Sequence, residues 1–243
     1  YNGKTTYTYN GSSIKPTIHI YGLNASDYSV TYQNNNAVGK GTVTAKGYGN
    51  YTGTITKSFT INPGAVKNFK VSKRGTDTLT FSWTKQPGVS GYLLQQKKDG
   101  KWKTVKKITS ASTVSYQIKS LSAAKTYSFR IRAYKGSVNG AYKNYTTSTA
   151  PKKVGSLSVK AAKKSAAVKW KKVSGNGYQL QYSTNSNFKN AKSVNLSSAS
   201  KTSKKISGLK KGKKYYVRVR AVKTRKDSSG KTYKYYGLSL IHI

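Results

Sequence analysis

Side chains suited to acid–base, nucleophilic or metal chemistry are scarce in this chain of 243 residues. It has no Cys, and its 4 acidic residues are all Asp: Asp27, Asp77, Asp99 and Asp227. They lie far apart, whereas a glycosidase needs a pair of carboxylates and a calcium site needs several oxygen ligands. The absence of Cys excludes disulfides, zinc–thiolate sites and thiol catalysis. We therefore predict that the chain is not an enzyme and that it holds no metal and no cofactor.

Cationic side chains are the abundant chemical groups. The chain has 46 Lys and Arg against 4 acids, a formal net charge of +42. The net charge rises from +4 in residues 1–63 to +15 in residues 64–150 and +23 in residues 151–243. A field of one sign attracts anionic polymers and accelerates their capture. Two interpretations stay open: docking to an anionic cell-wall polymer or acidic glycan, and Lys used simply as a solubilising residue.

The densest cationic cluster lies within residues 201–226. Residues 217–220 alternate Val and Arg, so that the two Arg face solvent if the two Val face the core. Residues 129–132 have the same alternation, and neighbouring strands would add Gln179 and Gln181, or Leu93 and Gln95. Such a strip of Arg and Gln can bind sulfate or phosphate bidentately. The candidate polyanion-binding residues are Lys210, Lys211, Lys213, Lys214, Arg218, Arg220, Arg130 and Arg132.

Trp102 is a candidate for sugar stacking. It follows an Asp-Gly turn signal at residues 99–100, and an exposed Trp there could stack on a sugar ring. The alternative is that it covers a sheet edge with Lys stems packed on it. For nucleic acid we predict only nonspecific, salt-sensitive binding, because the sequence has no recognition helix, zinc site or stacking platform.

The elements that must position these side chains are β-strands. Apolar and polar residues alternate over residues 79–83, 127–131 and 215–219, which is typical of strands with one buried face. Turn-forming residues separate such runs about every 8–12 residues, which indicates antiparallel sandwiches. No stretch of convincing length has a helical period, and no apolar run is long enough to span a membrane.

An internal repeat sets the expected domain organisation. Trp83 and Trp170 are 87 residues apart, Tyr92 and Tyr178 are 86 apart, and Tyr127 and Tyr215 are 88 apart. Pro and Gly interrupt the pattern at residues 62–64 and 150–151. We predict modules over residues 1–63, 64–150 (the middle repeat) and 151–237 (the C-terminal repeat), followed by residues 238–243.

Both repeats resemble fibronectin type III domains. The resemblance rests on Trp83 and Trp170 at the end of the second strand, a Gly-Tyr-x-Leu third strand, and Leu-x5-Tyr on the sixth. It implies that Tyr127 and Tyr215 are tyrosine-corner residues that follow Leu121 and Leu209. Alternating Arg on this strand is ordinary in that family, so the Arg strip has a purely structural alternative.

Residues 1–63 differ from the repeats. Segments 27–32, 34–36, 38–45 and 47–54 are similar to the short bacterial immunoglobulin-like repeats of secreted and surface proteins. That similarity implies an extracellular setting, secreted or attached to the cell wall or cell surface. It does not specify a ligand.

The final residues 238–243 resemble the translation of a sequencing adapter. We expect this hexapeptide to be foreign to the protein, which leaves the C-terminal repeat with an incomplete last strand. The alternative is an authentic apolar strand.

The predicted fold class is all-β, with three tandem antiparallel β-sandwich modules that act as monomers. The leading function is a non-catalytic extracellular spacer and adhesion role, with docking to anionic polymers. The alternatives are accessory carbohydrate-binding or positioning modules of a larger extracellular hydrolase, and a linker without a ligand. The predicted cores are Phe81, Trp83, Tyr92, Phe129 and Ile131 in the middle repeat, and Val168, Trp170, Tyr178, Val217 and Val219 in the C-terminal repeat.

Overall fold

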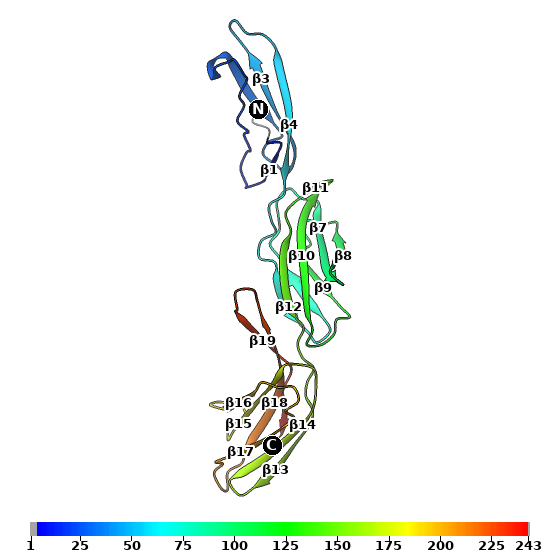
Figure 1. Cartoon of the computed structure of the whole chain (residues 1–243), viewed down its shortest axis with the longest axis vertical. Coiled ribbons are helices and arrows are strands. Elements are labelled where there is room, and N and C mark those ends of the chain that lie inside the picture. The colour runs from blue at the N-terminus through cyan, green and yellow to red at the C-terminus, as the bar shows by residue number, and fades with distance from the viewer. Residues whose placement is uncertain (1–3, 243) are drawn as a thin grey trace. The chain divides into compact units, whose positions relative to one another are not determined.

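The computed structural model describes residues 4–242, and its fold is all-β, as the sequence predicts (Figure 1). One 3-10 turn, η1 (Ala25–Asp27), is the only helical element among these residues, and no helix within them is long and apolar enough to cross a membrane. Two compact units divide the chain, and the division runs through the middle repeat. The first unit holds residues 1–70, 81–116 and 128–145, and the second holds residues 71–80, 117–127 and 146–243.

Residues 6–62 contain one four-stranded sheet. Its order is β1 (Thr6–Thr8), β4 (Thr54–Asn62), β3 (Gly39–Gly47) and β2 (Tyr28–Gln33), with β1 parallel to β4 and the other pairs antiparallel. Val43, Phe59 and Ile61 form its core, and Ile14 and Ile18 of the irregular segment before β2 pack against them. Gly41 is required here, because a Cβ would lie 2.6 Å from the Phe59 ring. The irregular segment before β2 thus covers the apolar face of this sheet, where a sandwich would have a second sheet.

The middle repeat contains two sheets. One has the order β5 (Lys70–Arg74), β6 (Leu79–Ser82) and β9 (Ser115–Ile118). The other has the order β11 (Val138–Asn139), β10 (Thr126–Lys135), β7 (Gly91–Lys98) and β8 (Lys101–Ile108), and β12 (Lys143–Ser148) also pairs with β10. All five predicted core residues are buried: Phe81, Trp83, Tyr92, Phe129 and Ile131.

The C-terminal repeat has the same two-sheet plan. One sheet has the order β13 (Gly155–Ala162), β14 (Ser165–Lys171) and β17 (Ser203–Ser207). The other has the order β16 (Lys192–Leu196), β15 (Gly177–Ser183), β18 (Tyr216–Lys226) and β19 (Thr232–Tyr236). The predicted core is again buried, in one cluster that includes Val168, Trp170, Tyr178, Val217 and Val219.

Residues 240–242 contribute a short last strand to the C-terminal repeat. β20 (Leu240–His242) pairs antiparallel with β18, where Leu240 lies opposite Val219. The edge therefore carries a strand, although it is only 3 residues long where β12 has 6. The register matches that of the middle repeat, because Gly140 N donates to Ala133 O and Gly237 N donates to Ala221 O just before these strands.

Both predicted tyrosine corners have the same hydrogen bond. Ser122 N donates to the Tyr127 hydroxyl at 2.7 Å, and Lys210 N donates to the Tyr215 hydroxyl at 3.2 Å. The residue before each donor is the predicted Leu, whose amide reaches back to the neighbouring hairpin: Leu121 N to Asp77 O, and Leu209 N to Lys164 O. These bonds align the two repeats residue by residue at this end of the sandwich.

Candidate anion-binding surfaces

Arg218 and Arg220 lie on the outward face of β18, as the alternation with Val predicts. Gln181 and Gln179 stand directly opposite on β15. Arg218 Nε donates to Gln181 Oε1 at 2.8 Å, and Arg220 donates to Gln179 Oε1 from Nε at 2.9 Å and from Nη2 at 2.6 Å. Each Gln then donates to β16, Gln181 to Ser193 and Gln179 to Asn195. We call these three-strand chains of side-chain hydrogen bonds the Arg–Gln rungs.

Aromatic rings cover the guanidinium groups of the rungs. The guanidinium carbon of Arg220 lies 3.8 Å from the Tyr236 ring centroid, and that of Arg218 lies 4.2 Å from the Phe188 centroid. Phe188 is held at φ 59°, which a bulky side chain rarely adopts. Burial lowers the pKa of Arg220, Tyr236 opposes that shift, and the charge of Arg218 lowers the pKa further. The guanidinium of Arg is still protonated at neutral pH.

The middle repeat has one comparable rung. Arg130 Nε donates to Gln95 Oε1 at 2.7 Å, and Gln95 Nε2 donates to Thr104 at 3.4 Å. Arg132 stands opposite Leu93 and so has no Gln to bind. Its Nε is buried and has no hydrogen-bond partner among the described residues. The structure therefore distinguishes Arg130 from Arg132, which the alternation alone treats as equivalent.

Trp102 is half-buried on β8 and belongs to this rung. The Arg130 guanidinium carbon lies 4.5 Å from the centroid of the Trp102 ring and 3.8 Å from that of Tyr142. A cation over the ring face interacts favourably with it. Since Arg130 already occupies one face of the indole, a sugar could stack only on the other face.

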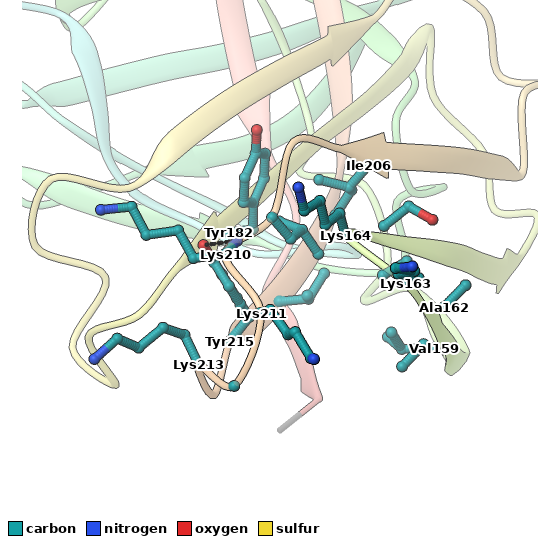
Figure 2. A pocket seen from close by; sticks show the side chains of 16 residues that line it. Val159, Ala162, Lys163, Lys164, Tyr182, Ile206, Lys210, Lys211, Lys213 and Tyr215 are labelled. Atoms are coloured by element: carbon teal, nitrogen blue, oxygen red, sulfur yellow. Dashed lines mark hydrogen bonds between the residues drawn. The ribbon is translucent and has the colours of Figure 1, made fainter.

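The four predicted Lys lie apart from the Arg–Gln rungs. Lys210, Lys211, Lys213 and Lys214 are exposed in the loop between β17 and β18. Three of them, Lys210, Lys211 and Lys213, line a pocket of ≈ 330 Å³ shown in Figure 2. An open hollow of ≈ 700 Å³ shares the same loop and adds Lys189, Lys192 and Lys214. The eight predicted polyanion-binding residues thus fall on three separate surfaces.

Two stretches of this chain, residues 64–149 and 150–234, match the fibronectin type III domain. The chain belongs to the fibronectin type III family. A two-domain fibronectin type III segment of chicken tenascin is similar at 21% identity, over 73% of this chain and 97% of that one, with a TM-score of 0.45. The FN1–FN3 domains of chicken CNTN1 are similar at 20% identity, over 81% of this chain and 77% of that one, with a TM-score of 0.36. No curated protein matches the sequence.

Fibronectin type III domains are often extracellular spacer or adhesion modules and are typically non-catalytic. The four Asp residues of this chain are exposed or half-buried, and none is buried. Asp99 makes the one ion pair found within residues 4–242, with Lys103 at 3.9 Å between exposed side chains. The same residues contain no cluster of three or more His, Cys, Asp or Glu side chains that could hold a metal.

The sequence did not identify the aromatic partners of the rungs. Phe188 and Tyr142 come from loops and Tyr236 comes from the edge strand β19, so their positions depend on how those segments fold back over the sheet. Among the partners of the Arg residues, only Gln179, Gln181 and Gln95 could be predicted from the sequence. Their spacing of two residues matches that of the Arg residues on the paired strand.

Proposed function

We propose that this fibronectin type III chain provides spacer and adhesion modules of a secreted or surface-attached bacterial protein, and that it docks to anionic cell-wall or glycan polymers. In this proposal residues 1–63 are a bacterial immunoglobulin-like module that precedes the two repeats. The Arg–Gln rungs are the observation that supports docking, because they are organised far beyond what solubility requires.

Each rung holds its Arg in a fixed orientation. The Gln of the neighbouring strand binds the Nε side, and a ring packs on the guanidinium plane. The Nη1 and Nη2 atoms of Arg218 have no hydrogen-bond partner within residues 4–242. A guanidinium fixed in this way loses little side-chain entropy when it binds a sulfate, phosphate or carboxylate. The surrounding excess of Lys adds long-range attraction.

Retention of the whole chain on an immobilised sulfated polysaccharide, eluted with a salt gradient, tests this proposal. Arg218→Gln/Arg220→Gln removes two charges from the rungs, and Lys204→Gln/Lys205→Gln removes two from β17 as a matched control. We expect the wild-type chain to elute well above about 0.15 M salt. The rung variant should elute near or below that concentration, and the control should elute close to wild type.

Equal shifts for both variants would show that the charge acts diffusely, since counterion release depends only on the number of charges at the contact. Elution of the wild-type chain below about 0.15 M salt would favour a spacer without this ligand.

A further inference from the structure

A second pocket of the C-terminal repeat, of ≈ 190 Å³, lies on its five-stranded sheet. The lining residues come from β15, β16, β18 and β19 and from the residues that flank these strands, all within residues 176–236. Val222 belongs to this lining and follows Arg218 and Arg220 on the outward face of β18. A cavity of about 150 Å³ holds one benzene ring, so this pocket has room for one aromatic ring.

Tyr134 occupies the corresponding place in the middle repeat. Tyr134 stands opposite Gly91 on the neighbouring strand, and Val222 stands opposite Gly177 in the same way. Tyr134 is 9% exposed, and its hydroxyl donates to Ile108 O at 3.2 Å. Its side chain crosses β7 at Gly91, where a Cβ would lie 3.1 Å from the Tyr134 hydroxyl oxygen. This part of the sheet therefore accommodates a phenol ring whose hydroxyl reaches a carbonyl two strands away.

The C-terminal repeat keeps the place for this ring but lacks the ring itself. Val222 is too short to cross β15 as Tyr134 crosses β7. Leu196 is the equivalent of Ile108, since each stands opposite the central buried Tyr of its repeat. Leu196 lines the pocket, and because a carbonyl has two lone pairs, Leu196 O can accept a hydrogen bond from a hydroxyl placed there. Gly177 keeps the crossing point open, because a Cβ there would collide with Leu196 O.

The side chains at one edge of the pocket suit an aromatic occupant. Tyr236 is 36% exposed, with Arg220 over one face of its ring at 3.8 Å, and it lines the pocket with part of the remaining surface. Lys234 lines the same edge and is exposed. In the middle repeat the ammonium group of Lys107 lies 5.3 Å from the Tyr134 ring centroid. Lys234 can therefore supply from β19 the cation that Lys107 supplies from β8.

The opposite edge of the pocket suits an occupant that is carried on a peptide chain. Asn195 and Ser197 line this edge and are exposed, so that a ring can enter from solvent while its backbone stays outside. Neither Asn195 Nδ2 nor the Ser197 hydroxyl has a hydrogen-bond partner within residues 4–242. Both can donate to the backbone carbonyls of the segment that carries the ring.

We propose that this pocket binds a tyrosine side chain of a partner protein. The ring would lie over Gly177 beside Tyr236, and its hydroxyl would donate to Leu196 O, as Tyr134 donates to Ile108 O in the middle repeat. The site borders one Arg–Gln rung but does not depend on polymer docking.

Titration of the isotope-labelled whole chain with a capped Gly-Tyr-Gly tripeptide, followed by amide chemical shifts, tests the proposal. We expect saturable shifts at Gly177, Ser197 and Thr224, which line the pocket. Capped Gly-Phe-Gly keeps the ring without the hydroxyl, so it should bind about 2- to 10-fold weaker through the loss of one hydrogen bond. Capped Gly-Leu-Gly also lacks the aromatic ring and should bind at least about 10-fold weaker.

Exchange of Val and Tyr between the two repeats tests the equivalence directly. Val222→Tyr fills the pocket as Tyr134 does, and it should abolish the shifts while the remaining amide spectrum shows a retained fold. Tyr134→Val should open a second site and add shifts at Gly91 and Ile108. Arg218→Gln, a rung variant outside the pocket, should leave tripeptide binding unchanged.

Equal binding of the Tyr and Leu tripeptides, or shifts that survive Val222→Tyr, would overturn the proposal. A folded Tyr134→Val chain without new shifts at Gly91 would overturn it too, since the exchange of Tyr for Val would then not create the site. So would shifts of the same amides by p-cresol but not by the Tyr tripeptide, since the pocket would then bind a free phenol and not a side chain.

Discussion

The middle and C-terminal repeats share a nearly identical centre. Trp83 and Tyr92 have ring centroids 5.3 Å apart at 66°, and Trp170 and Tyr178 have centroids 5.3 Å apart at 65°. In both repeats the Tyr hydroxyl accepts a hydrogen bond from a backbone amide and donates one to a backbone carbonyl. For Tyr92 these groups are Gln86 N and Ala111 O. For Tyr178 they are Val173 N and Ala199 O. A buried Tyr that satisfies its hydroxyl twice fixes both chain path and ring position.

The packing around that centre is free to vary. Phe81 and Phe129 are 4.9 Å apart in the middle repeat, where Phe69 also stacks on Phe81. Val168 and Val217 take the equivalent places of the two Phe in the C-terminal repeat. The Trp–Tyr pair is therefore the part of the core that both repeats keep, whereas side-chain volume elsewhere in the core is distributed differently.

The ends of the two sandwiches differ most. At the end that holds the tyrosine corner, the middle repeat has Asp77 and Lys125, whereas the C-terminal repeat has Lys164 and Lys213 at the equivalent positions and adds Lys163, Lys210 and Lys211. The Arg–Gln rungs, in contrast, persist in both repeats because they are built on paired strands.

Truncation of the central Trp tests the shared centre most severely. Trp83→Ala and Trp170→Ala should each lower the free energy of unfolding by about 3–5 kcal/mol, since both residues are 5% exposed and leave a large cavity. Trp83→Ala should lie at the upper end, because Trp83 also contacts Phe69. Urea denaturation, with hydrogen exchange to assign each transition to a repeat, measures the effect. A loss below about 1 kcal/mol at either position would show that the centres are not equivalent.

Short-range patterns in the sequence were sufficient to predict the cores and the outward Arg residues. A period of two residues places Val217 and Val219 inside and Arg218 and Arg220 outside, whatever the surrounding loops do. Because the two repeats align, the core residues predicted for one repeat also predict the core residues of the other.

Contacts made by loops and edge strands could not be predicted in this way. Phe188 contacts Arg218 from a loop whose turns are held by the side chains of Asn185 and Asn187, and Tyr236 contacts Arg220 from the open end of the β18–β19 hairpin. The Lys residues of the loop between β17 and β18 are close to Arg218 and Arg220 in sequence. Proximity in sequence does not show whether a loop stays on the same face of the sheet as the strand that follows it. Likewise, nothing local indicated that β1 pairs in parallel with β4.

Exchange of the last strand would sharpen the comparison of the two ends. Replacement of residues 238–243 by the segment Ala141–Ala150 keeps the register set by Gly140 and Gly237 and supplies the buried Thr and Ser residues. Each backbone hydrogen bond contributes about 0.5–1.5 kcal/mol, so the free energy of unfolding of the C-terminal repeat should rise by roughly 2–4 kcal/mol. The midpoint of urea denaturation measures this gain. An unchanged midpoint would mean that the two ends do not accept the same segment.

The hairpins before these strands should differ in their response to acid, which is the smallest expected effect. The Asp227 carboxylate accepts hydrogen bonds from Ser229 Oγ at 2.7 Å, Tyr233 Oη at 3.0 Å and Lys231 N at 3.1 Å. The Ser229 hydroxyl is the main cause of a lowered pKa for Asp227, which burial opposes and the Tyr233 and backbone hydrogen bonds reinforce. Residues 136–137 close the corresponding β10–β11 hairpin without an acid.

Because the folded pKa of Asp227 lies below the unfolded value, its contribution to stability is complete above about pH 4 and is lost as the pH falls through the folded pKa. The protection factors for amide exchange at Lys226 and Thr232, which are corrected for the intrinsic pH dependence, should therefore fall on acidification, while those at Lys135 and Val138 should stay constant. Asp227→Asn should remove this extra sensitivity and make the two hairpins alike. If the variant kept it, the acid response would come from the general repulsion of a strongly cationic chain instead of from this carboxylate.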